Sequence, residues 1–217
     1  MNDLKIVWSV KSECGPTREK NEDSHFPLVS GNKFVPFRAG VFDGMGGHKK
    51  GEVASSIASS VMNDDKENIE DYVQLANKKI FEYQSNNTDS EGMGTTMTAV
   101  QIDNSGVMRV AHVGDSRCYI LSKRNFIKLT EDENVPGYQN VLIQALGTKK
   151  NLDIQKKDIK LSSGDVVLLC TDGLYNEVGD EYLKKKLQEG ISADTLVSEV
   201  LLQKPRDNVT AIIINVI

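Results

Sequence analysis

The sequence predicts an α+β protein whose β-sheets are stacked in the middle, with helices on the outside. Most of its apolar runs are short and rich in β-branched residues, which is typical of strands. Segments with apolar residues at helical spacing are fewer, and they fall before and after the main run of strands. Stacked sheets covered by helices would bury the apolar face of every element.

The predicted strands are bounded by Gly, Asp, Asn and Ser, which favour turns. Two of these boundaries, at residues 103–106 and 123–125, are typical of hairpin turns, so the strands that they join are expected to be antiparallel. The expected strands are residues 5–10, 34–42, 96–102, 108–113, 118–122, 126–129, 165–170 and 209–216.

Four helices are expected, two before the main run of strands and two after it. In three of them, apolar residues recur three or four positions apart, which places these residues on one face of the helix. The expected helices are residues 52–62, 66–84, 180–188 and 193–203, with a break at Gly190 between the last two.

Length and composition favour one soluble globular domain over residues 1–217. Hydrophobic residues make up 39% of the chain and charged residues 26%, which is ordinary for a folded protein and unlike a disordered one. The 26 Lys and Arg against 31 Asp and Glu give a net charge of −5. This charge argues against a nucleic-acid binder that neutralises phosphates broadly, but it permits a small local phosphate site.

The cysteines and the hydropathy of the chain indicate a cytoplasmic location without a membrane span. Cys14, Cys118 and Cys170 are odd in number and widely spaced. This arrangement argues against a zinc site or a disulfide framework and favours a reducing cytosol. No apolar segment is typical of a signal peptide or approaches the roughly 20 residues that cross a bilayer.

Most acidic residues are expected on solvated faces, but a few follow apolar, strand-like runs, in most cases beside glycine. A carboxylate at a strand end has a fixed backbone direction, and a neighbouring glycine lets a ligand or a carbonyl group approach closely. Several such acids at one sheet edge would repel one another unless a cation lay between them. These segments are Asn21-Glu22-Asp23, Phe42-Asp43-Gly44, Gly114-Asp115, Thr171-Asp172-Gly173 and Asp207-Asn208.

Two interpretations of these acids are open from the residues alone. Each Asp-Gly pair taken by itself is typical of a turn, because both residues favour turns for local reasons. Together, the acids would supply oxygen ligands without His or Cys, which favours hard divalent cations such as Mg²⁺ or Mn²⁺. Their number and their order along the chain favour a metal centre.

A series of short motifs runs in a fixed order along nearly the whole chain. They are Arg18-Glu19-Lys20-Asn21-Glu22-Asp23, Asp43-Gly44-Met45-Gly46-Gly47-His48, Gly92-Met93-Gly94-Thr95-Thr96, His112-Val113-Gly114-Asp115-Ser116-Arg117, Ala145-Leu146-Gly147, Leu169-Cys170-Thr171-Asp172-Gly173-Leu174 and Asp207-Asn208-Val209-Thr210. Each motif alone is common. In this order they resemble the metal-dependent protein phosphatases of type 2C, in their compact bacterial form.

The resemblance implies a four-layer α-β-β-α sandwich, in which helices flank two central antiparallel β-sheets. It also implies a centre of two divalent cations, Mn²⁺ or Mg²⁺. By position in the motifs, the ligands of this centre would be Asp43, Asp172, Asp207 and the backbone carbonyl of Gly44.

Three further acids receive roles from the same resemblance. Glu22 would hold a cation or its waters, and Asp23 would act beside the centre through water. Asp115 matches a position that in relatives helps to bind a weaker third cation. Arg18 is the candidate phosphate clamp, because a guanidinium group can bind two phosphate oxygens at once. The alternative for Arg18 is an ordinary surface arginine in an Arg-Glu-Lys stretch.

The implied activity is hydrolysis of phosphoserine and phosphothreonine in proteins, opposing a serine/threonine kinase in bacterial signalling. Water activated between two cations would attack phosphorus directly, so no phospho-enzyme would be needed. The expected partner is a phosphorylated protein rather than a nucleic acid or a membrane, and the chain is expected to act as a monomer.

Several other residues are expected to support the fold rather than to react. His48 is expected to cap or pack a helix, and His112, within a strand, to be structural. Ser116 lacks the His and acid partners that a nucleophilic serine needs. Met45 stands where some relatives carry a proposed proton donor, so water would have to protonate the leaving group. Residues expected to form the scaffold are Thr95, Thr96, Ser116 and Arg117.

The chain departs from the family pattern after Thr130. Relatives usually carry a longer segment there, which forms a mobile flap beside the site. Here few residues separate Thr130 from Ala145. We expect a short or absent flap and a more open site, which affects substrate choice and the third cation near Asp115.

Two other classes of function stay open from the sequence. One is a catalytically weak or silent domain of the same fold that binds phosphoproteins and regulates them. The other is a structural metal-binding protein without a phosphate role. The intact acids Glu22, Asp43, Asp172 and Asp207 argue against the first, and Arg18 argues against the second.

Overall fold

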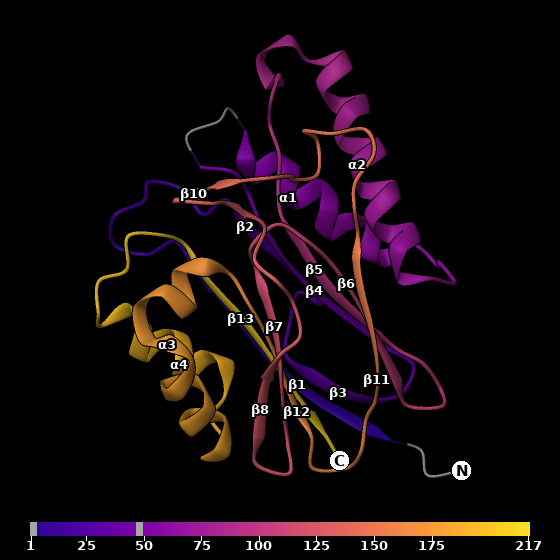
Figure 1. Ribbon diagram of the computed structural model, residues 1–217, viewed down its shortest axis with the longest axis vertical. Helices are drawn as coiled ribbons and strands as arrows, with labels where there is room; N and C mark the ends of the chain where they lie inside the picture. Colours follow the sequence, from indigo (N-terminus) through magenta and orange to yellow (C-terminus); the bar gives the residue numbers. More distant parts are fainter. Residues whose placement is uncertain (1–3, 47–49) are drawn as a thin grey trace.

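The computed structural model describes residues 4–46 and 50–217 and contains two antiparallel β-sheets that face each other (Figure 1). The first sheet has six strands in the order β3-β1-β13-β12-β7-β8. These strands are β3 (Gly31–Phe34), β1 (Lys5–Glu13), β13 (Val209–Val216), β12 (Val166–Cys170), β7 (Arg117–Ser122) and β8 (Asn125–Lys128).

The second sheet has five strands in the order β11-β6-β5-β4-β2. Every neighbouring pair in it is antiparallel, as in the first sheet. The strands are β11 (Gln155–Lys160), β6 (Val107–Val113), β5 (Met97–Ile102), β4 (Phe37–Asp43) and β2 (Asp23–Phe26). A separate two-stranded hairpin consists of β9 (Asn134–Val135) and β10 (Tyr138–Leu142).

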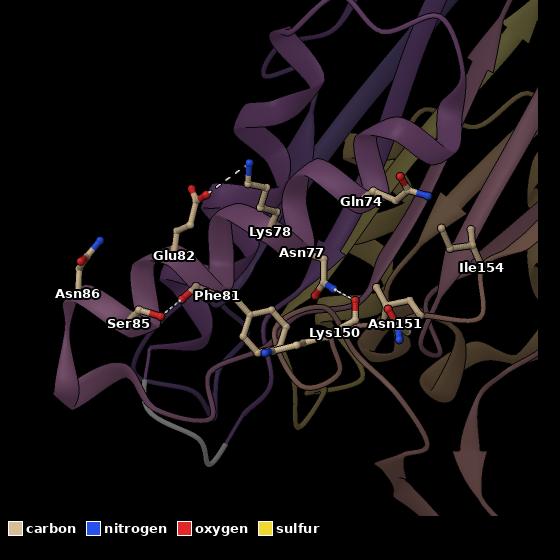
Figure 2. A pocket seen from close by; sticks show the side chains of 11 residues that line it. Gln74, Asn77, Lys78, Phe81, Glu82, Ser85, Asn86, Lys150, Asn151 and Ile154 are labelled. Atoms are coloured by element: carbon tan, nitrogen blue, oxygen red, sulfur yellow. Dashed lines mark hydrogen bonds and ion pairs between the residues drawn. The ribbon is translucent and has the colours of Figure 1, made fainter.

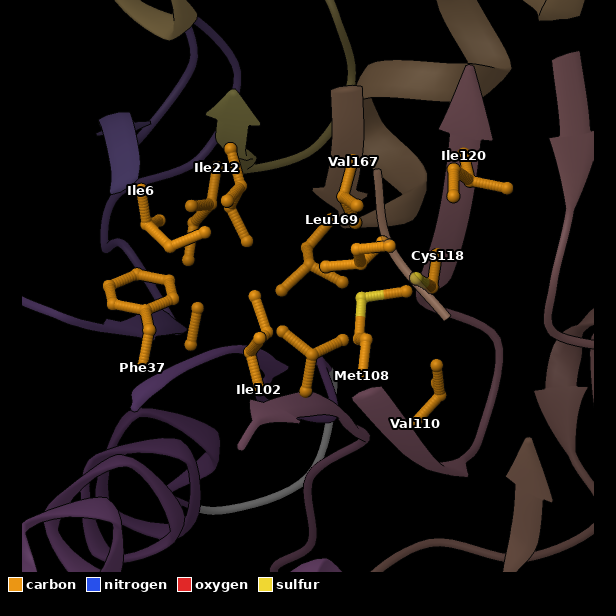
Figure 3. Packing of buried hydrophobic residues seen from close by; sticks show 14 of the residues in the cluster. Ile6, Phe37, Ile102, Met108, Val110, Cys118, Ile120, Val167, Leu169 and Ile212 are labelled. Atoms are coloured by element: carbon orange, nitrogen blue, oxygen red, sulfur yellow. The ribbon is translucent and has the colours of Figure 1, made fainter. Parts of the chain in front are cut away.

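The main core lies between the two sheets and takes side chains from both (Figure 3). Successive side chains of a strand point to opposite faces of the sheet, so one strand can contribute to two cores. On β13, Ile212 and Ile214 join the core between the sheets, whereas Ala211 and Ile213 belong to a second core under the helices. Both faces of this strand are therefore buried.

Two pairs of helices cover the outer faces of the sheets (Figure 1). The helices α1 (Gly51–Ser60) and α2 (Ile69–Asn86) pack on the second sheet, and α3 (Asp172–Gln188) and α4 (Ala193–Leu201) pack on the first. Two short 3-10 helices occupy Val61–Asn63 and Thr88–Ser90. The predicted four-layer α-β-β-α sandwich is confirmed. In the described part of the chain, no helix is both long and apolar enough to cross a membrane.

Several predicted boundaries were wrong for physical reasons. The strand expected over residues 34–42 is two strands, because Val35-Pro36 separates β3 from β4 and proline cannot donate a ladder hydrogen bond. The strand β11 was missed because three of its six residues are exposed lysines, which protect a sheet edge from association. The helix α3 begins at Asp172 rather than at residue 180, and Gly179 breaks its helical geometry with φ 70°.

The shortened segment after Thr130 is present as the hairpin of β9 and β10. Its backbone is anchored at Glu133, whose N–H donates to the Gly114 carbonyl (2.9 Å) and whose carbonyl accepts from Ile143 (2.7 Å). The expected flap is thus short rather than absent.

Candidate metal centre

The predicted acids are brought together by strand ends from both sheets. Asp43 is the last residue of β4, and Asp23 is the first residue of β2, directly opposite Asp43 in the antiparallel pairing. Asp172 begins α3 two residues after β12, and Asp207 lies two residues before β13, the strand beside β12. The fold therefore gathers at one end of the sandwich four acids that span nearly the whole chain.

Asp23 joins the two sheets at this place. Its Oδ2 accepts hydrogen bonds from Thr171 Oγ1 (2.9 Å), directly after β12, and from Thr210 Oγ1 (2.6 Å), on β13. Its Oδ1 is buried, and no hydrogen-bond partner for it exists among the described residues. Asp172 Oδ1 is likewise buried and has no hydrogen-bond partner among the described residues. Two carboxylate oxygens are therefore buried without a donor, which is costly unless a cation binds them.

The electrostatics of these carboxylates show the same crowding. Burial, followed by the charges of Asp207 and Glu22, raises the pKa of Asp23 to about 7 against the opposing hydrogen bonds from the threonines. Burial and the charges of Asp115 and Asp207 raise the pKa of Asp172 to about 7. The pKa of Asp43 is raised well above its ordinary value, by burial first and then by neighbouring acids. These acids resist ionising together without a compensating positive charge.

Glycines let the loops around the acids approach closely. A Cβ on Gly44 would lie 2.4 Å from the Gly51 carbonyl oxygen and 2.6 Å from that of Glu22. A Cβ on Gly173 would lie 2.1 Å from the Asn208 carbonyl oxygen. All three distances are well below van der Waals contact. The glycine of each Asp-Gly pair therefore serves close packing at the site, beyond the local needs of a turn.

Glu22 lies beside Gly44, at the rim of the carboxylate cluster. Its carbonyl accepts the N–H of Gly44 (3.1 Å), and its own N–H donates to Asn208 Oδ1 (2.9 Å). Burial and the charge of Glu52 raise the pKa of its side chain, although Arg18 opposes this shift. The two predicted ligand positions at residues 22 and 44 are thus held side by side.

Arg18 contacts the cluster through Asp207. Its Nη2 donates to Asp207 Oδ2 at 2.7 Å, and its Nε donates to the Arg206 carbonyl at 3.2 Å. Burial opposes the charge on Arg18, but Asp207, Glu22 and Asp43 outweigh it and raise the pKa of the guanidinium group. The structure thus places the predicted clamp at the acids rather than on an unrelated surface.

Asp115 lies in the turn between β6 and β7 and is buried. Its Oδ2 accepts from the side-chain amide of Asn134 (2.9 Å), and its carbonyl accepts from the Tyr175 hydroxyl (3.0 Å). Burial raises its pKa, although the hydrogen bond from Asn134 opposes this shift. The charge of Asp115 also raises the pKa of Asp172, so Asp115 belongs to the same acidic cluster.

The predicted scaffold residues hold Asp43 and its surroundings. Thr96 Oγ1 accepts the N–H of Asp43 (3.0 Å), and Thr95 Oγ1 donates to the Asp43 carbonyl (2.9 Å). Ser116 Oγ is hydrogen-bonded to Thr96 Oγ1 at 2.7 Å and is fully buried. Arg117 forms an ion pair with Asp132 at 2.6 Å. The prediction for His48 lies outside the described residues.

Sequence reasoning gave no role to Asn208, although it lies in one of the quoted motifs. Its Oδ1 accepts from the Glu22 N–H, and its Nδ2 donates to the carbonyls of Cys14 (2.7 Å) and Lys20 (2.9 Å). Asn208 thus holds the loop that carries Arg18 and Glu22 against the start of β13. Its position directly after Asp207 was the signal that could have shown this.

A separate groove of about 840 Å³ lies along α2, against residues 150–154. Figure 2 shows Asn77 reaching across it to Lys150, whose carbonyl accepts a hydrogen bond of 3.2 Å. None of the predicted site residues lines this groove. The carboxylate cluster, rather than the groove, is therefore the candidate site.

The residues present fit divalent cations. The donor set is carboxylate and carbonyl oxygen, the type that Mg²⁺ and Mn²⁺ prefer, and it includes two buried oxygens without donors among the described residues. In the described part of the chain, no three Asp, Glu, His or Cys side chains yet converge on one point. Cation binding would therefore require some of these side chains to turn toward a common point.

Comparison with known proteins agrees with the fold. A family model described as protein phosphatase 2C matches residues 17–200. The serine/threonine phosphatase stp of Listeria monocytogenes is 31% identical over 94% of this chain and 93% of its own length. The serine/threonine protein phosphatase PstP of Mycobacterium tuberculosis is 30% identical over 99% of this chain, which corresponds to 46% of PstP.

Solved structures give the same result. The catalytic domain of PstP, in complex with two manganese ions, superposes with a TM-score of 0.86 at 27% identity and covers 99% of each chain. The fold and the family match define a phosphatase domain. The chain belongs to the protein phosphatase 2C family and is a protein phosphatase.

Proposed function

We propose that this chain hydrolyses phosphoserine and phosphothreonine esters in proteins at a centre of two divalent cations, Mn²⁺ or Mg²⁺. The observation that carries the proposal is the partly buried cluster in which burial and mutual repulsion raise the pKa values of Asp23, Asp43 and Asp172. The relatives named as serine/threonine phosphatases and the manganese complex of PstP support it.

Each acid of the cluster receives a role in this proposal. Asp43, Asp172 and Asp207 hold the cations, with the Gly44 carbonyl as a further ligand. Glu22 holds a cation or its waters. Asp23, already bonded to Thr171 and Thr210 through one oxygen, uses its other oxygen to orient water. Asp115 helps to bind a weaker third cation.

The remaining chemistry belongs to the protein's own side chains. Bound divalent cations lower the pKa of water and offset negative charge on a phosphoryl group. Arg18 lies against Asp207 and keeps its charge, so it can exchange this contact for two oxygens of an incoming phosphate. Met45 carries no titratable group, so protonation of the leaving alkoxide falls to water.

The biological setting follows from the same proposal. The substrate is a phosphorylated protein and the opposing enzyme is a serine/threonine kinase. Residues 1–217 act as one domain and as a monomer. The three cysteines are unpaired, with Cys118 and Cys170 buried, which suits a reducing cytoplasm. No observation favours a catalytically silent phosphoprotein-binding domain.

Release of phosphate from a small aryl phosphate tests the activity. We expect turnover when Mn²⁺ is added and none after addition of a chelator. Asp207→Asn should abolish turnover while the circular dichroism spectrum stays unchanged. Metal-independent turnover, or full activity of Asp207→Asn, would show that the centre is placed wrongly.

A further inference from the structure

His112 is a buried titratable residue that the proposed chemistry does not use. It lies on β6, three residues before Asp115, and its side chain has no exposed surface. A ring buried to this extent needs partners for both nitrogen atoms. Both are present: Nδ1 lies 2.8 Å from Thr98 Oγ1, and Nε2 lies 3.1 Å from the Glu131 carbonyl oxygen.

The partners of the ring define its protonation state. A carbonyl oxygen only accepts, so Nε2 carries a proton and donates it to Glu131. The Thr98 hydroxyl has a single hydrogen, which it donates to the Ser116 carbonyl at 3.0 Å, so Thr98 Oγ1 accepts from Nδ1. His112 therefore donates to both partners; burial opposes the resulting charge and lowers the pKa of the ring, whereas the nearby Glu133 carboxylate favours the charge.

The partner on the Nδ1 side supports the backbone next to Asp115. Thr98 Oγ1 donates its single hydrogen to the Ser116 carbonyl at 3.0 Å. Ser116 follows Asp115 directly, and its hydroxyl bonds to Thr96. The Nδ1 contact thus fixes the hydroxyl that anchors the Asp115 turn to β5.

The partner on the Nε2 side supports the side chain of Asp115. Glu131 begins a short segment that runs beside residues 112–115. Within it, Glu133 bonds twice to Gly114: its N–H donates to the Gly114 carbonyl (2.9 Å), and its carboxylate accepts the Gly114 N–H (2.8 Å). The next residue, Asn134, donates to Asp115 Oδ2 at 2.9 Å.

We propose that His112 is a positioning residue for Asp115, holding the backbone of Asp115 through Thr98 and its carboxylate through the segment Glu131–Asn134. This inference rests on the proposed function, in which Asp115 helps to bind a cation. His112 touches neither cation nor substrate. Its effect is to keep the Asp115 carboxylate in one orientation and to tie the β9–β10 hairpin to it.

Two conservative variants separate the two contacts. A glutamine amide can occupy the position of Nε2, so His112→Gln can keep the bond to Glu131 and lose the contact with Thr98. An asparagine amide can occupy the position of Nδ1, so His112→Asn can keep Thr98 and lose Glu131. His112→Ala loses both. Val110→Ala, a buried change on the same strand, controls for lost packing.

Hydrogen exchange in the presence of a chelator tests the structural half of the proposal. The Glu133 amide donates to the Gly114 carbonyl and the Ile143 amide donates to the Glu133 carbonyl, so both amides report on how firmly Glu133 is held. Loss of one buried hydrogen bond should speed their exchange about 5- to 10-fold in His112→Asn and His112→Ala. We expect wild-type rates in His112→Gln and Val110→Ala. Wild-type rates in His112→Ala would overturn the proposal.

The Mn²⁺ dependence of turnover tests the functional half. We expect the Mn²⁺ concentration for half-maximal activity to rise about 10-fold in His112→Ala, the usual effect of removing a residue that orients a ligand. The rise should be smaller in the two conservative variants and absent in Val110→Ala. If all variants showed the same Mn²⁺ dependence and only their melting temperatures fell, His112 would contribute to core packing alone. Absence of Mn²⁺-dependent turnover in the wild type would contradict the proposed function instead, and the exchange rates would still decide the role of His112.

Discussion

Arg18 Nη2 donates a 2.7 Å hydrogen bond to Asp207 Oδ2, across 189 positions of sequence. Each of the two side chains keeps 34% of its surface exposed, so the pair can be reached from solvent. The contact joins the loop before β2 to the segment just before β13, and it holds a guanidinium group against the acids of the proposed metal centre.

Arg18→Ala should raise the KM for a phosphopeptide about 10-fold, with a smaller loss in kcat. The reason is that a bidentate guanidinium contact to phosphate is lost while the acids stay in place. Arg18→Lys should recover only part of the affinity, because an ammonium group cannot bind two oxygens in the same plane. Steady-state kinetics on a phosphothreonine peptide measure both.

Lys20→Ala is the matched control for Arg18. Lys20 lies two residues away, its side chain is 71% exposed, and it pairs with Glu52 at 3.3 Å. We expect its KM to stay within about twofold of the wild type, as for an exposed ion pair. If Arg18→Ala and Lys20→Ala raised KM equally, Arg18 would act only through nonspecific attraction between its charge and the phosphate.

Asp172→Asn should stabilise the metal-free protein and remove its response to Mn²⁺. The pKa of Asp172 is raised to about 7 by burial and by neighbouring acids, so its charge opposes folding at neutral pH. The free energy of unfolding in chelator should rise by at least about 1 kcal/mol, since one pKa unit corresponds to about 1.4 kcal/mol. Urea denaturation with and without Mn²⁺ measures both effects.

Glu177→Gln serves as the control for Asp172. Glu177 lies on the same helix and is exposed. This variant should keep both the stability and the response to Mn²⁺ of the wild type. An Asp172→Asn protein less stable than the wild type in chelator would mean that the carboxylate is held favourably without a cation.

The metal-free protein should lose stability as the pH rises from about 4 to 7. Asp23 and Asp172 have folded-state pKa values of about 7, against ordinary values near 3.8. Over this range the folded chain keeps protons on these two acids that the unfolded chain has released. The stabilisation from the raised pKa values is therefore complete below about pH 4 and is lost as the pH passes 7. Urea unfolding in chelator at several pH values measures the slope, which should be shallower in Asp172→Asn. Stability that rises steadily over this range in the wild type would contradict the raised values.

Gly173→Ala should destabilise the protein by about 1–3 kcal/mol and lower its activity, because the new Cβ would meet the Asn208 carbonyl at 2.1 Å and push backbone against backbone. Gly46→Ala meets only the flexible end of Arg18, at 2.8 Å. Gly46→Ala should therefore keep its stability and raise KM. Thermal unfolding together with kinetics separates the two, and equal stability losses would contradict the packing argument.

Much of the fold could be predicted because strand patterns and helix patterns differ in period. β13, with apolar residues on both faces, and α4, with Leu196, Val197 and Val200 buried on one face, follow directly from those periods. The edge strand β11 could not be predicted in this way, because only one of its faces packs and its lysines resemble a loop. The start of α3 was missed because Gly179 interrupts the pattern.

That the acids would lie together could be predicted, as could the support of Asp43 by Thr95 and Thr96, but the other supports could not. Asp43 and Asp172 lie at or just after strand ends, and each is followed directly by a glycine in the sequence. The roles of Thr171, Thr210 and Asn208 depend on the pairing of β12 with β13 and on the approach of the two sheets. Such contacts join residues far apart in sequence, so no local pattern records them.

Calorimetric titration of Mn²⁺, run beside phosphate release from a phosphothreonine peptide, tests the central claim most directly. Wild-type protein should bind about two Mn²⁺ ions per chain, and turnover should follow their binding. Asp207→Asn should bind at least one ion fewer and should not turn over. Wild-type binding and wild-type turnover in Asp207→Asn would contradict the assignment of the metal centre.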